Sequence, residues 1–418
     1  MAQSLRILVA GAGIGGLATA LACSRAGHSV RIFEQTAALE PLGAGIQLGP
    51  NVTRILRQWG LANSLSSVAA TPARLVVRDA HSGAVLGQLR LGDEMVQRYG
   101  APYVTLHRAD LQGLLADALA RLQVSGKVPD IAFGHAVDSF SQDAMAVQLR
   151  LKTTNSHASA PHADVQGDLL VGADGLWSRV RNALLGDGVP NSTGHKALRS
   201  LIRRSDLPAA LRQRVNSDDV GVWLGPNLHV VHYPVRGGEW VNLVVIVANK
   251  QRQPASEWSQ PVDSTDLDPV LAGLFGMLRN LLTLPGQQSA TSPEWRQWDL
   301  FSRSPMQSAQ SHGLGRVALL GDAAHPMLPF LAQGAGMAIE DAQGLCEALA
   351  PTRQSADIST QLQAFGQARW QRNARVQARS MRNGKIFHTS GAMRWARDAA
   401  MKMLGERILD VPWLYRGG

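Results

Sequence analysis

The first residues with a chemically informative spacing form a glycine-rich loop near the amino end of the chain. Gly11, Gly13 and Gly16 give the pattern Gly-x-Gly-x-x-Gly, with Gly15 inside it. In such a loop one glycine permits a tight turn, one lets the backbone approach a pyrophosphate, and one lets a helix pack closely on a strand. The free N–H groups of the helix that follows favour phosphate oxygens. The loop therefore predicts a dinucleotide site.

The segments around this loop supply the elements that must position it. An apolar strand over residues 5–9 precedes the loop, a helical pattern follows and ends at Gly27, and a second strand over residues 29–33 finishes at Glu34. A strand, a helix and a strand in about thirty residues imply a parallel sheet. Glu34 stands where an acidic side chain accepts hydrogen bonds from a ribose, which favours NAD or FAD over NADP.

Two more motifs at strand ends lie far downstream. DLLVGADGLWSRVR at residues 168–181 is a buried strand that ends at Asp174 before a helix. VALLGDAAHP at residues 317–326 contains Asp322 and leads to a long helix that starts near residues 334–336. Ligands bind at the carboxyl ends of parallel strands, so Asp322 suits a ribityl or ribose hydroxyl. The amides at the start of the long helix suit negative charge on a flavin ring.

These three motifs, in this order, resemble the single-component FAD-dependent aromatic hydroxylases, the para-hydroxybenzoate hydroxylase class. GAGIQLGPN at 43–51, HVVHYP at 229–234 and GDAAHPMLPFLAQGAGMAIEDA at 321–342 are similar to its salicylate hydroxylase and 3-hydroxybenzoate 6-hydroxylase branch. The resemblance runs from residue 5 to about residue 385. It implies an α/β protein in which a Rossmann-like FAD-binding fold is interleaved with a mixed β-sheet substrate domain and followed by a C-terminal helical region.

Alternating strands at 74–78 and 228–233 favour a mixed or antiparallel sheet and help to place the domain boundaries. The predicted segments are 1–73, 105–195 and 297–350 for the FAD-binding domain, 74–104 and 196–296 for the substrate domain, and 351–418 for the helical region.

The resemblance also implies the cofactors and the reaction. FAD is the expected cofactor and NADH or NADPH the co-substrate, with O2 used to hydroxylate a phenolic or hydroxybenzoate-like ring through a flavin C4a-hydroperoxide. The residues that it assigns to the cofactor are Gly11, Gly13, Gly15, Gly16, Glu34, Gln35, Gly45, Gln47, Arg108, Asp174, Asp322, Gly334, Ala335 and Gly336. Asp174 is a family position associated with both FAD and NAD(P)H, although a helix cap is its plain structural alternative.

The candidate catalytic residues are His229 and Tyr233. Period-two alternation places both side chains on one face of the strand, where they are predicted to share a relay to a substrate hydroxyl, with the alternative that both are ordinary sheet residues. The matching positions of the 3-hydroxybenzoate and 6-hydroxynicotinate enzymes carry the same pair. Substrate contacts are assigned to His229, Tyr233 and Pro329. Gln47 replaces a His of the 6-hydroxynicotinate enzyme, and Pro329 replaces a Gln of the 3-hydroxybenzoate enzyme but fits the para-hydroxybenzoate and salicylate pattern.

Two rival functions stay open at this point. One is oxygenation of a larger, non-benzoate substrate such as a polyketide, quinone or alkene, for which Tyr233 would be dispensable. The other is a flavoprotein that consumes NAD(P)H without oxygenating a substrate.

Composition limits the partners. The net charge of +9 is spread out and accompanies no nucleic-acid motif, so it favours attraction of small anionic molecules. Cys23 and Cys346 are too few for a metal cluster, and no metal is expected. No apolar run is long enough for a transmembrane segment and no secretory signal is visible, so a cytoplasmic homodimer or monomer is predicted.

Several smaller expectations concern loops, helices and histidines. Residues 158–167 are predicted to be a hairpin loop and 251–265 a surface loop. Helical pattern extends from 335 almost to 404, with breaks at Pro351, Gly384 and Gly391. The arginines at 369, 372, 375, 379 and 382 share one helical face, which is solvated or pairs with acids of this chain or a partner copy. His325 is expected to be structural, while four further histidines have no recognisable constellation: His81, His107, His135 and His195.

Overall fold

The computed structural model describes residues 4–39, 44–124, 129–154, 163–215, 218–249, 260–262, 267–285, 295–352 and 354–417. The chain forms two compact units, each assembled from three stretches of sequence. The first comprises Met1–Leu42, Leu111–Asn191 and Ser302–Ser380, and the second comprises Gly43–Asp110, Ser192–Phe301 and Met381–Gly418. These units are defined by packing alone. The assignment of segments to FAD-binding and substrate domains stays a prediction.

The first unit is built on a six-stranded sheet in the order β18-β19-β11-β1-β2-β7, parallel except for β18. A separate antiparallel sheet has the order β10-β9-β8. The strands are β1 (Arg6–Ala10), β2 (Ser29–Glu34), β7 (Asp130–Phe133), β8 (His135–Gln142), β9 (Val147–Thr153), β10 (Ala163–Gly167), β11 (Leu169–Gly172), β18 (Gly313–Leu314) and β19 (Val317–Leu319).

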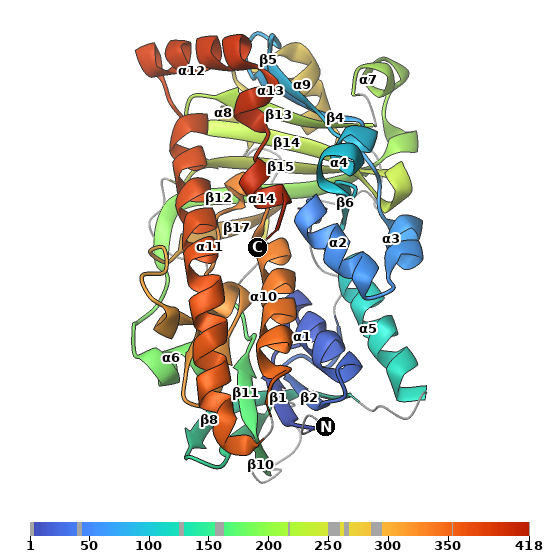
Figure 1. The fold of residues 1–418 in the computed structure, drawn as a ribbon. Helices are drawn as coiled ribbons and strands as arrows, with labels where there is room; N and C mark the ends of the chain where they lie inside the picture. The colour runs from blue at the N-terminus through green and yellow to red at the C-terminus, as the bar shows by residue number, and fades with distance from the viewer. Residues whose placement is uncertain are drawn as a thin grey trace. The chain divides into compact units, whose positions relative to one another are not determined.

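The central strands of this unit are apolar on both faces because both faces are covered. Helices α1 and α10 lie side by side against the parallel sheet (Figure 1), and the three-stranded sheet shares a buried cluster with its other face, through Leu8, Phe33 and Leu149. The helices are α1 (Ile14–Arg25), α6 (Arg179–Leu185) and α10 (Gly334–Leu349), together with α5 (Arg108–Val124), which begins in the second unit, and α11 (Ile358–Phe387), which ends there.

The second unit is built on an eight-stranded mixed sheet in the order β16-β17-β12-β15-β14-β13-β4-β5, beside the antiparallel pair β3-β6. The strands are β3 (Gly45–Leu48), β4 (Arg74–Asp79), β5 (Val85–Arg90), β6 (Val104–His107), β12 (Asn191–Arg203), β13 (Asp219–Gly225), β14 (Leu228–Val235), β15 (Trp240–Ala248), β16 (Gln260–Pro261) and β17 (Arg296–Ser302).

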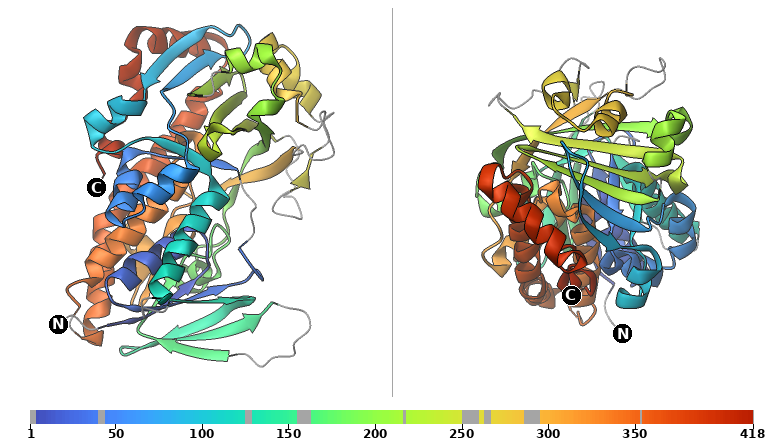
Figure 2. Two further views of the ribbon diagram at one scale, coloured as in Figure 1. Left: turned by 90° about the vertical axis from the view of Figure 1, so that its right-hand side faces the viewer. Right: turned by 90° about the horizontal axis from the view of Figure 1, so that it is seen from above.

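One face of the large sheet is an apolar core. Val230, Leu243 and Trp223 pack there against Leu278 and Leu281, which both belong to one short helix, α9, on that face (Figure 2). The opposite face of the sheet carries polar side chains, among them Arg199, His229 and Tyr233. The helices of this unit are α2 (Pro50–Gln58), α3 (Ala62–Val68), α4 (Gly92–Tyr99), α7 (Ala209–Arg214), α8 (Asp268–Leu271), α9 (Gly276–Leu282), α12 (Gly391–Leu404), α13 (Glu406–Leu409) and α14 (Pro412–Tyr415).

The strand–helix–strand unit predicted around the glycine loop is confirmed, as are the strands at 74–78 and 228–233. The hairpin loop predicted at 158–167 is wrong over 163–167, which form β10 because Val165 pairs in register with Leu149; residues 158–162 lie outside the described residues. Most of the surface loop predicted at 251–265 also lies outside them, while Gln260–Pro261 form β16.

The predicted helix break at Gly384 is wrong, since α11 continues to Phe387. A single interior glycine costs a helix only about 1 kcal/mol, and burial of the apolar side chains of Leu362, Phe365 and Val376 stabilises α11 by more than that. The breaks at Pro351 and Gly391 are confirmed, because α10 ends at Leu349 and α12 begins at Gly391. No helix within the described ranges is long and apolar enough to cross a membrane.

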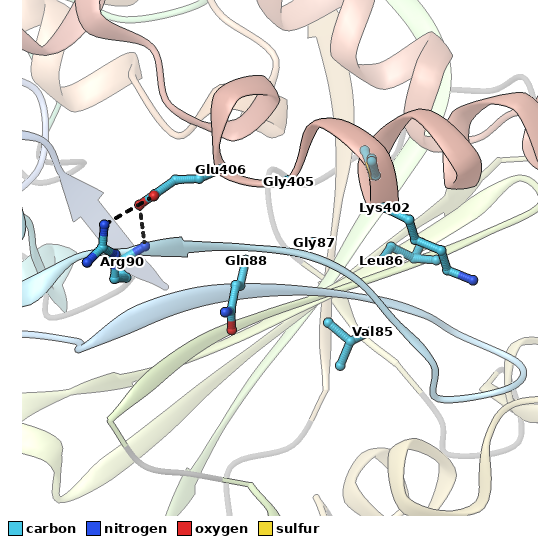
Figure 3. Close-up of a pocket in the computed structure, with 9 residues that line it drawn as sticks. Val85, Leu86, Gly87, Gln88, Arg90, Lys402, Gly405 and Glu406 are labelled. Atoms are coloured by element: carbon cyan, nitrogen blue, oxygen red, sulfur yellow. Dashed lines mark hydrogen bonds and ion pairs between the residues drawn. The ribbon is translucent and has the colours of Figure 1, made fainter.

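The second unit also has a surface groove of about 440 Å³ between β5 and the α12–α13 segment (Figure 3). Its two sides are joined by Arg90, whose backbone N–H donates to Glu406 Oε1 at 3.1 Å. None of the residues predicted to do chemistry lines this groove, whose lining is Val85, Leu86, Gly87, Gln88, Arg90, Met401, Lys402, Gly405 and Glu406.

Candidate functional site

The glycine loop of the first unit excludes a larger residue at two of its four glycines and crowds one at a third. Gly11 has φ +96°, and a Cβ there would lie 2.6 Å from the Ala173 carbonyl oxygen. A Cβ at Gly16 would lie 1.9 Å from the Gly11 carbonyl oxygen, and one at Gly15 would lie 2.9 Å from a methyl of Leu320. These glycines therefore let the loop, α1 and the strand ends pack closely.

Gly13 differs, because a Cβ there would meet nothing within 4 Å. It is the residue before α1, and no side chain caps the first turn of that helix. Open space in front of unshielded N–H groups is what a pyrophosphate requires. The loop therefore fits the phosphates of FAD.

Glu34 ends β2 beside this loop and is already anchored by it. Its carboxylate accepts hydrogen bonds from the Ala12 N–H at 2.7 Å, the Thr36 N–H at 2.9 Å and the Thr36 hydroxyl at 3.0 Å. A carboxylate has about four acceptor positions, so one is left for a ribose hydroxyl. At Gln35 the contact is made by the backbone, whose carbonyl accepts from the Thr154 hydroxyl at 2.6 Å.

Asp174 lies where β11 turns into α6. One carboxylate oxygen accepts from the Ser178 hydroxyl at 2.5 Å, and the other accepts from the N–H groups of Arg179 and Val180 at 2.8 and 3.1 Å. Burial raises the pKa of Asp174 above its usual value, while these bonds oppose the shift. The capping alternative is thus visible in the structure, and the cofactor role of Asp174 stays a prediction.

The GDAAH turn is held from beneath by a buried network. His325 Nε2 contacts an Asp341 carboxylate oxygen that also accepts from the Gly321 N–H at 3.2 Å. Arg369 donates to the other Asp341 oxygen at 3.0 Å, and to Glu340 at 3.0 Å. His325 therefore has the structural role predicted for it. The same contacts, with those of Arg372 to Glu340, confirm that part of the arginine series pairs with acids of this chain.

His312, His325 and Asp341 lie close enough to suggest a metal site. Most of their ligand atoms already have partners: His312 Nδ1 contacts the Leu319 carbonyl at 3.0 Å, its Nε2 contacts Asn373 at 2.9 Å, and Asp341 is bonded to Arg369. A guanidinium at this distance repels a cation, so the cluster fits a hydrogen-bond network better than a metal centre.

The remaining predicted residues of the first unit surround the start of α10. Asp322 is exposed in the turn above the network, and Pro329 is half-buried just before the helix. Gly334 and Ala335 form the first turn of α10, which has no side-chain cap, followed by buried Gly336. Ser380 donates to the Leu328 carbonyl at 2.6 Å, so α11 fixes this loop. Unshielded helix amides here fit an electron-rich flavin ring.

Gly45, Gln47, Arg108, His229 and Tyr233 belong to the second unit. Gly45 lies against Tyr233, because a Cβ on it would come within 2.6 Å of the Tyr233 ring. The Gly45 N–H donates to Asn242 Oδ1 at 2.7 Å, and the Tyr103 hydroxyl donates to Gln47 Oε1 at 2.5 Å. The N–H of Arg108 donates to the Ala44 carbonyl at 3.0 Å.

Tyr233 is 4 % exposed. Burial raises the pKa of its phenol above the ordinary value of about 10, and Arg199 and Gln47 only partly oppose that rise. Tyr233 is therefore a neutral hydrogen-bond donor at physiological pH.

Arg199 on β12 was missed by sequence reasoning. It pairs with Val244 of β15, which pairs with Val231 of β14, so its side chain shares a sheet face with Tyr233. Its guanidinium lies 5.2 Å from the ring centre of Trp298, and its Nε is buried without a hydrogen-bond partner. Burial lowers the pKa of Arg199, and Arg108 lowers it further. In the part of the chain that the structure describes, no acid pairs with it.

His229 also has neighbours that sequence reasoning missed. Its Nδ1 lies 2.8 Å from Nε2 of His388, just beyond the end of α11, and the His388 ring centre lies 5.2 Å from that of His195. The expectation that His195 has no constellation is therefore wrong. Only tertiary folding brings these three histidines together, because they come from separate segments of the chain.

His229 and Tyr233 lie on one face of β14, as the alternation predicts, but four residues of strand separate them by about 13 Å. The structure gives Tyr233 and His229 different neighbours. A relay that joins them needs a bridging group, and it stays a prediction.

Known proteins resemble this chain over nearly its whole length. A family model described as "FAD binding domain" matches residues 4–383. The 3-hydroxybenzoate 6-hydroxylase of Polaromonas naphthalenivorans is 35 % identical over 414 residues, which cover 98 % of this chain and 96 % of the relative. The 6-hydroxynicotinate 3-monooxygenase of Bordetella bronchiseptica is 34 % identical over 89 % of each chain. A solved salicylate hydroxylase substrate complex has a TM-score of 0.79 at 26 % identity, covering 99 % of this chain and 96 % of the other. These likenesses confirm the predicted α/β fold.

Proposed function

Because the chain belongs to the family of FAD-dependent aromatic-ring monooxygenases, we propose that it uses NADH or NADPH and O2 to hydroxylate a small phenolic substrate that carries a carboxylate or a similar anionic group. When bound, FAD supplies the redox chemistry, accepting a hydride and activating oxygen. The protein's own task is to bind the ring, orient it and manage the proton of its hydroxyl.

One observation carries the choice of an anionic phenol. Arg199, a half-buried residue whose Nε is buried, shares a sheet face with buried Tyr233, and no acid among the described residues forms an ion pair with its guanidinium. Burying a charge without a partner costs several kcal/mol, so such a group is a candidate for a ligand of opposite sign. The carboxylate of an aromatic acid would complete this site, with Trp298 beside the guanidinium.

Tyr233 and His229 are proposed to serve the same substrate hydroxyl, Tyr233 by direct contact and His229 through a bridging group, because about 13 Å of strand lies between them. Tyr233, held neutral by burial, donates a hydrogen bond that stabilises a phenolate. His229, whose pKa is held well below its ordinary value by burial, is the uncharged imidazole that accepts the proton. Pro329, at the loop before α10, is proposed to contact the ring of the same substrate.

We assign the cofactor residues in each unit separately. In the first unit we assign the pyrophosphate to the Gly11–Gly16 segment, a ribose to Glu34 with Gln35 beside it, the ribityl region to Asp322 and the flavin ring to Gly334, Ala335 and Gly336. Asp174 is proposed to contact FAD or NAD(P)H. In the second unit Gly45, Gln47 and Arg108 are proposed to face the cofactor.

The experiment is a turnover screen with FAD-loaded protein. NADH and NADPH oxidation and O2 uptake are measured with hydroxybenzoates, 6-hydroxynicotinate and uncharged phenols of the same ring pattern, and products are identified by mass. The proposal is supported if a hydroxybenzoate stimulates both NAD(P)H oxidation and O2 uptake and its product carries one additional oxygen atom. Stimulation by uncharged phenols alone, or none from any ring compound, contradicts it. Loss of CO2 from the product would indicate a decarboxylating hydroxylation.

We also propose that the enzyme works in the cytoplasm, as a homodimer or a monomer. Cys23 and Cys346 are free thiols in the structure, as a reducing compartment requires. Fractionation of the source cells and light scattering of the purified protein test these two statements.

A further inference from the structure

Three imidazole rings from three separate segments lie together on the polar side of the second unit. His229 of β14 is 2 % exposed, and its Nδ1 lies 2.8 Å from Nε2 of His388. Phe387 packs edge-on against His229, with ring centres 5.5 Å apart. The ring centre of His195, on β12, lies 5.2 Å from that of His388. His388 therefore stands between a buried histidine and a half-buried one.

We propose that His388 is a positioning residue for the hydroxylation reaction, which sets the tautomer of His229 and passes the substrate's proton from His229 towards His195. This inference rests on the proposed function, in which His229 accepts that proton. It adds a residue from the carboxyl end of α11, which no motif of the sequence assigns to the site.

One fixed contact sets the tautomer of His195, and the proposed relay then requires particular tautomers of His388 and His229. His195 Nδ1 lies 2.9 Å from the Thr193 carbonyl oxygen, which can only accept, so Nδ1 carries the hydrogen. Neutral His195 then presents a lone pair at Nε2. If His388 directs its Nδ1–H to that side, its Nε2 accepts from His229 Nδ1–H. His229 Nε2 is left with a lone pair, the form that a proton acceptor needs.

The electrostatic surroundings keep the rings uncharged. Burial, and then His388 and His195, hold the pKa of His229 well below its ordinary value. Burial, His195 and Arg397 lower the pKa of His388 to about 4. Arg397 of α12 is a charged group that faces His388; it donates to the Phe387 carbonyl at 2.7 Å and pairs with Asp398 at 2.8 Å. At neutral pH both rings are therefore able to accept a proton.

The proton count balances over one catalytic cycle. When the substrate hydroxyl ionises, its proton binds His229 Nε2, the Nδ1 proton of His229 moves to His388 Nε2, and the Nδ1 proton of His388 leaves towards His195 and solvent. His229 and His388 end in their other tautomers with no net charge, while His195 releases the proton from its Nε2 to solvent and keeps its Nδ1 hydrogen on the Thr193 carbonyl. When the hydroxylated product is protonated, the protons move back and the original tautomers return.

Three variants separate proton transfer from packing. His388→Gln keeps an acceptor for His229 but cannot pass a proton, His388→Leu keeps neither, and His195→Asn keeps the contact to Thr193 but loses Nε2. His135→Asn is the matched control. Its Nδ1 makes the same contact to a carbonyl two residues earlier, 2.7 Å from the Phe133 oxygen, in the first unit and outside this cluster.

The readout is the ionisation of a bound hydroxynitrobenzoate, whose phenolate absorbs at longer wavelength than its phenol, in holoenzyme mixed rapidly with this probe from pH 6 to 9. We expect the ionisation rate to fall about 10-fold or more in His388→Gln and further in His388→Leu. Added imidazole should partly restore the rate in His388→Leu, and FAD occupancy should be unchanged. His195→Asn should slow ionisation less, and His135→Asn not at all.

Unchanged rates and pH profiles in both His388 variants would overturn the inference, as would equal losses in His388→Leu with and without imidazole. Failure of the proposed function is distinguishable from this. It would appear as wild-type holoenzyme that neither ionises the probe nor oxidises NAD(P)H faster with any hydroxybenzoate.

Discussion

Each unit of the molecule holds an arginine in a largely enclosed cluster of side chains, but the two clusters are completed differently. In the first unit Arg369 donates to both Glu340 and Asp341, and Asp341 also contacts His325 and Asn373. In the second unit Arg199 lies over Trp298 with an unbonded Nε, and Tyr233 lies beside it.

The difference indicates which cluster serves folding and which serves binding. A buried charge whose partners all come from the protein is part of the fold. Removing one partner leaves the remaining charge buried without compensation, which lowers the free energy of unfolding. A buried charge without such a partner makes the folded chain less stable until a ligand arrives, a cost that is common at functional sites. We therefore expect substitutions in the first cluster to change stability and substitutions in the second to change ligand selection.

The largest effect is expected for Asp341→Ala. The change leaves Arg369 and His325 buried without their shared acceptor, which typically costs about 3–5 kcal/mol of unfolding free energy. Urea denaturation of the purified protein measures it. Asp164→Ala is the matched control, because Asp164 forms a 3.6 Å ion pair with Arg150 whose side chains are mostly exposed, and such pairs contribute little. Equal free energies of unfolding for the two variants would show that the first cluster does not stabilise the fold.

The pH dependence of this effect has a definite sign. Burial by itself opposes ionisation of Asp341, but His325 and Arg369 hold its pKa well below the usual range. The folded pKa is thus lower than the unfolded value of about 3.9. The carboxylate therefore contributes fully above about pH 4, and its contribution is lost as the pH falls through the folded pKa. The gap between wild type and Asp341→Ala should be constant from pH 7 to 5 and shrink below pH 4.

Arg199→Met is expected to change selectivity rather than stability. Losing a charge-assisted contact to a carboxylate costs about 2–4 kcal/mol, or roughly 30- to 1000-fold in kcat/KM, for a hydroxybenzoate. The matching hydroxybenzamide should lose little. Arg203→Met is the control. Arg203 lies on β12, as Arg199 does, and its guanidinium carbon lies 4.9 Å from the ring centre of Trp240, but Arg203 is exposed. Equal losses for the acid and the amide would show that Arg199 does not bind the carboxylate.

The sequence predicted local structure well where the pattern is local. Glycine spacing indicated the turn before α1, and the alternation at 229–233 placed His229 and Tyr233 on one face of β14. It missed Arg199 because nothing in a strand sequence tells which of its arginines will face a polar pocket. That fact follows from the register of β12 against β15, a pairing of residues more than forty positions apart.

Long-range contacts explain the other omissions. His388 lies 159 residues from His229, so no spacing rule connects them. Gly384 was expected to break a helix because local propensity disfavours it, and packing of α11 outweighed that propensity. Asp174 kept both of its alternatives, because a carboxylate that caps a helix can still accept a further hydrogen bond from a cofactor.

Tyr233→Phe gives a smaller effect that sharpens the assignment of the second cluster. Removing one hydrogen-bond donor to a phenolate is expected to lower kcat about 10- to 100-fold while FAD stays bound. Tyr99→Phe is the control, since the Tyr99 hydroxyl donates to Asp410 at 2.7 Å elsewhere in the same unit. Rapid-mixing turnover measurements distinguish them. Full activity in Tyr233→Phe would favour a substrate that does not ionise, such as an alkene or a larger ring system.

The smallest effect is expected at Glu34, which is intermediate between the two clusters. Its carboxylate accepts three bonds from Ala12 and Thr36 and keeps room for one more. Glu34→Ala should weaken FAD binding about 10-fold, as expected for one charge-assisted bond to a ribose hydroxyl, measured by fluorescence titration of apoprotein with FAD. Thr36→Ala separates the two parts of this role, because it removes one anchor of the carboxylate and leaves the carboxylate itself. If Thr36→Ala weakens FAD binding as much as Glu34→Ala, Glu34 acts by holding the loop rather than by binding the ribose. Its role would then be structural, like that of the first cluster.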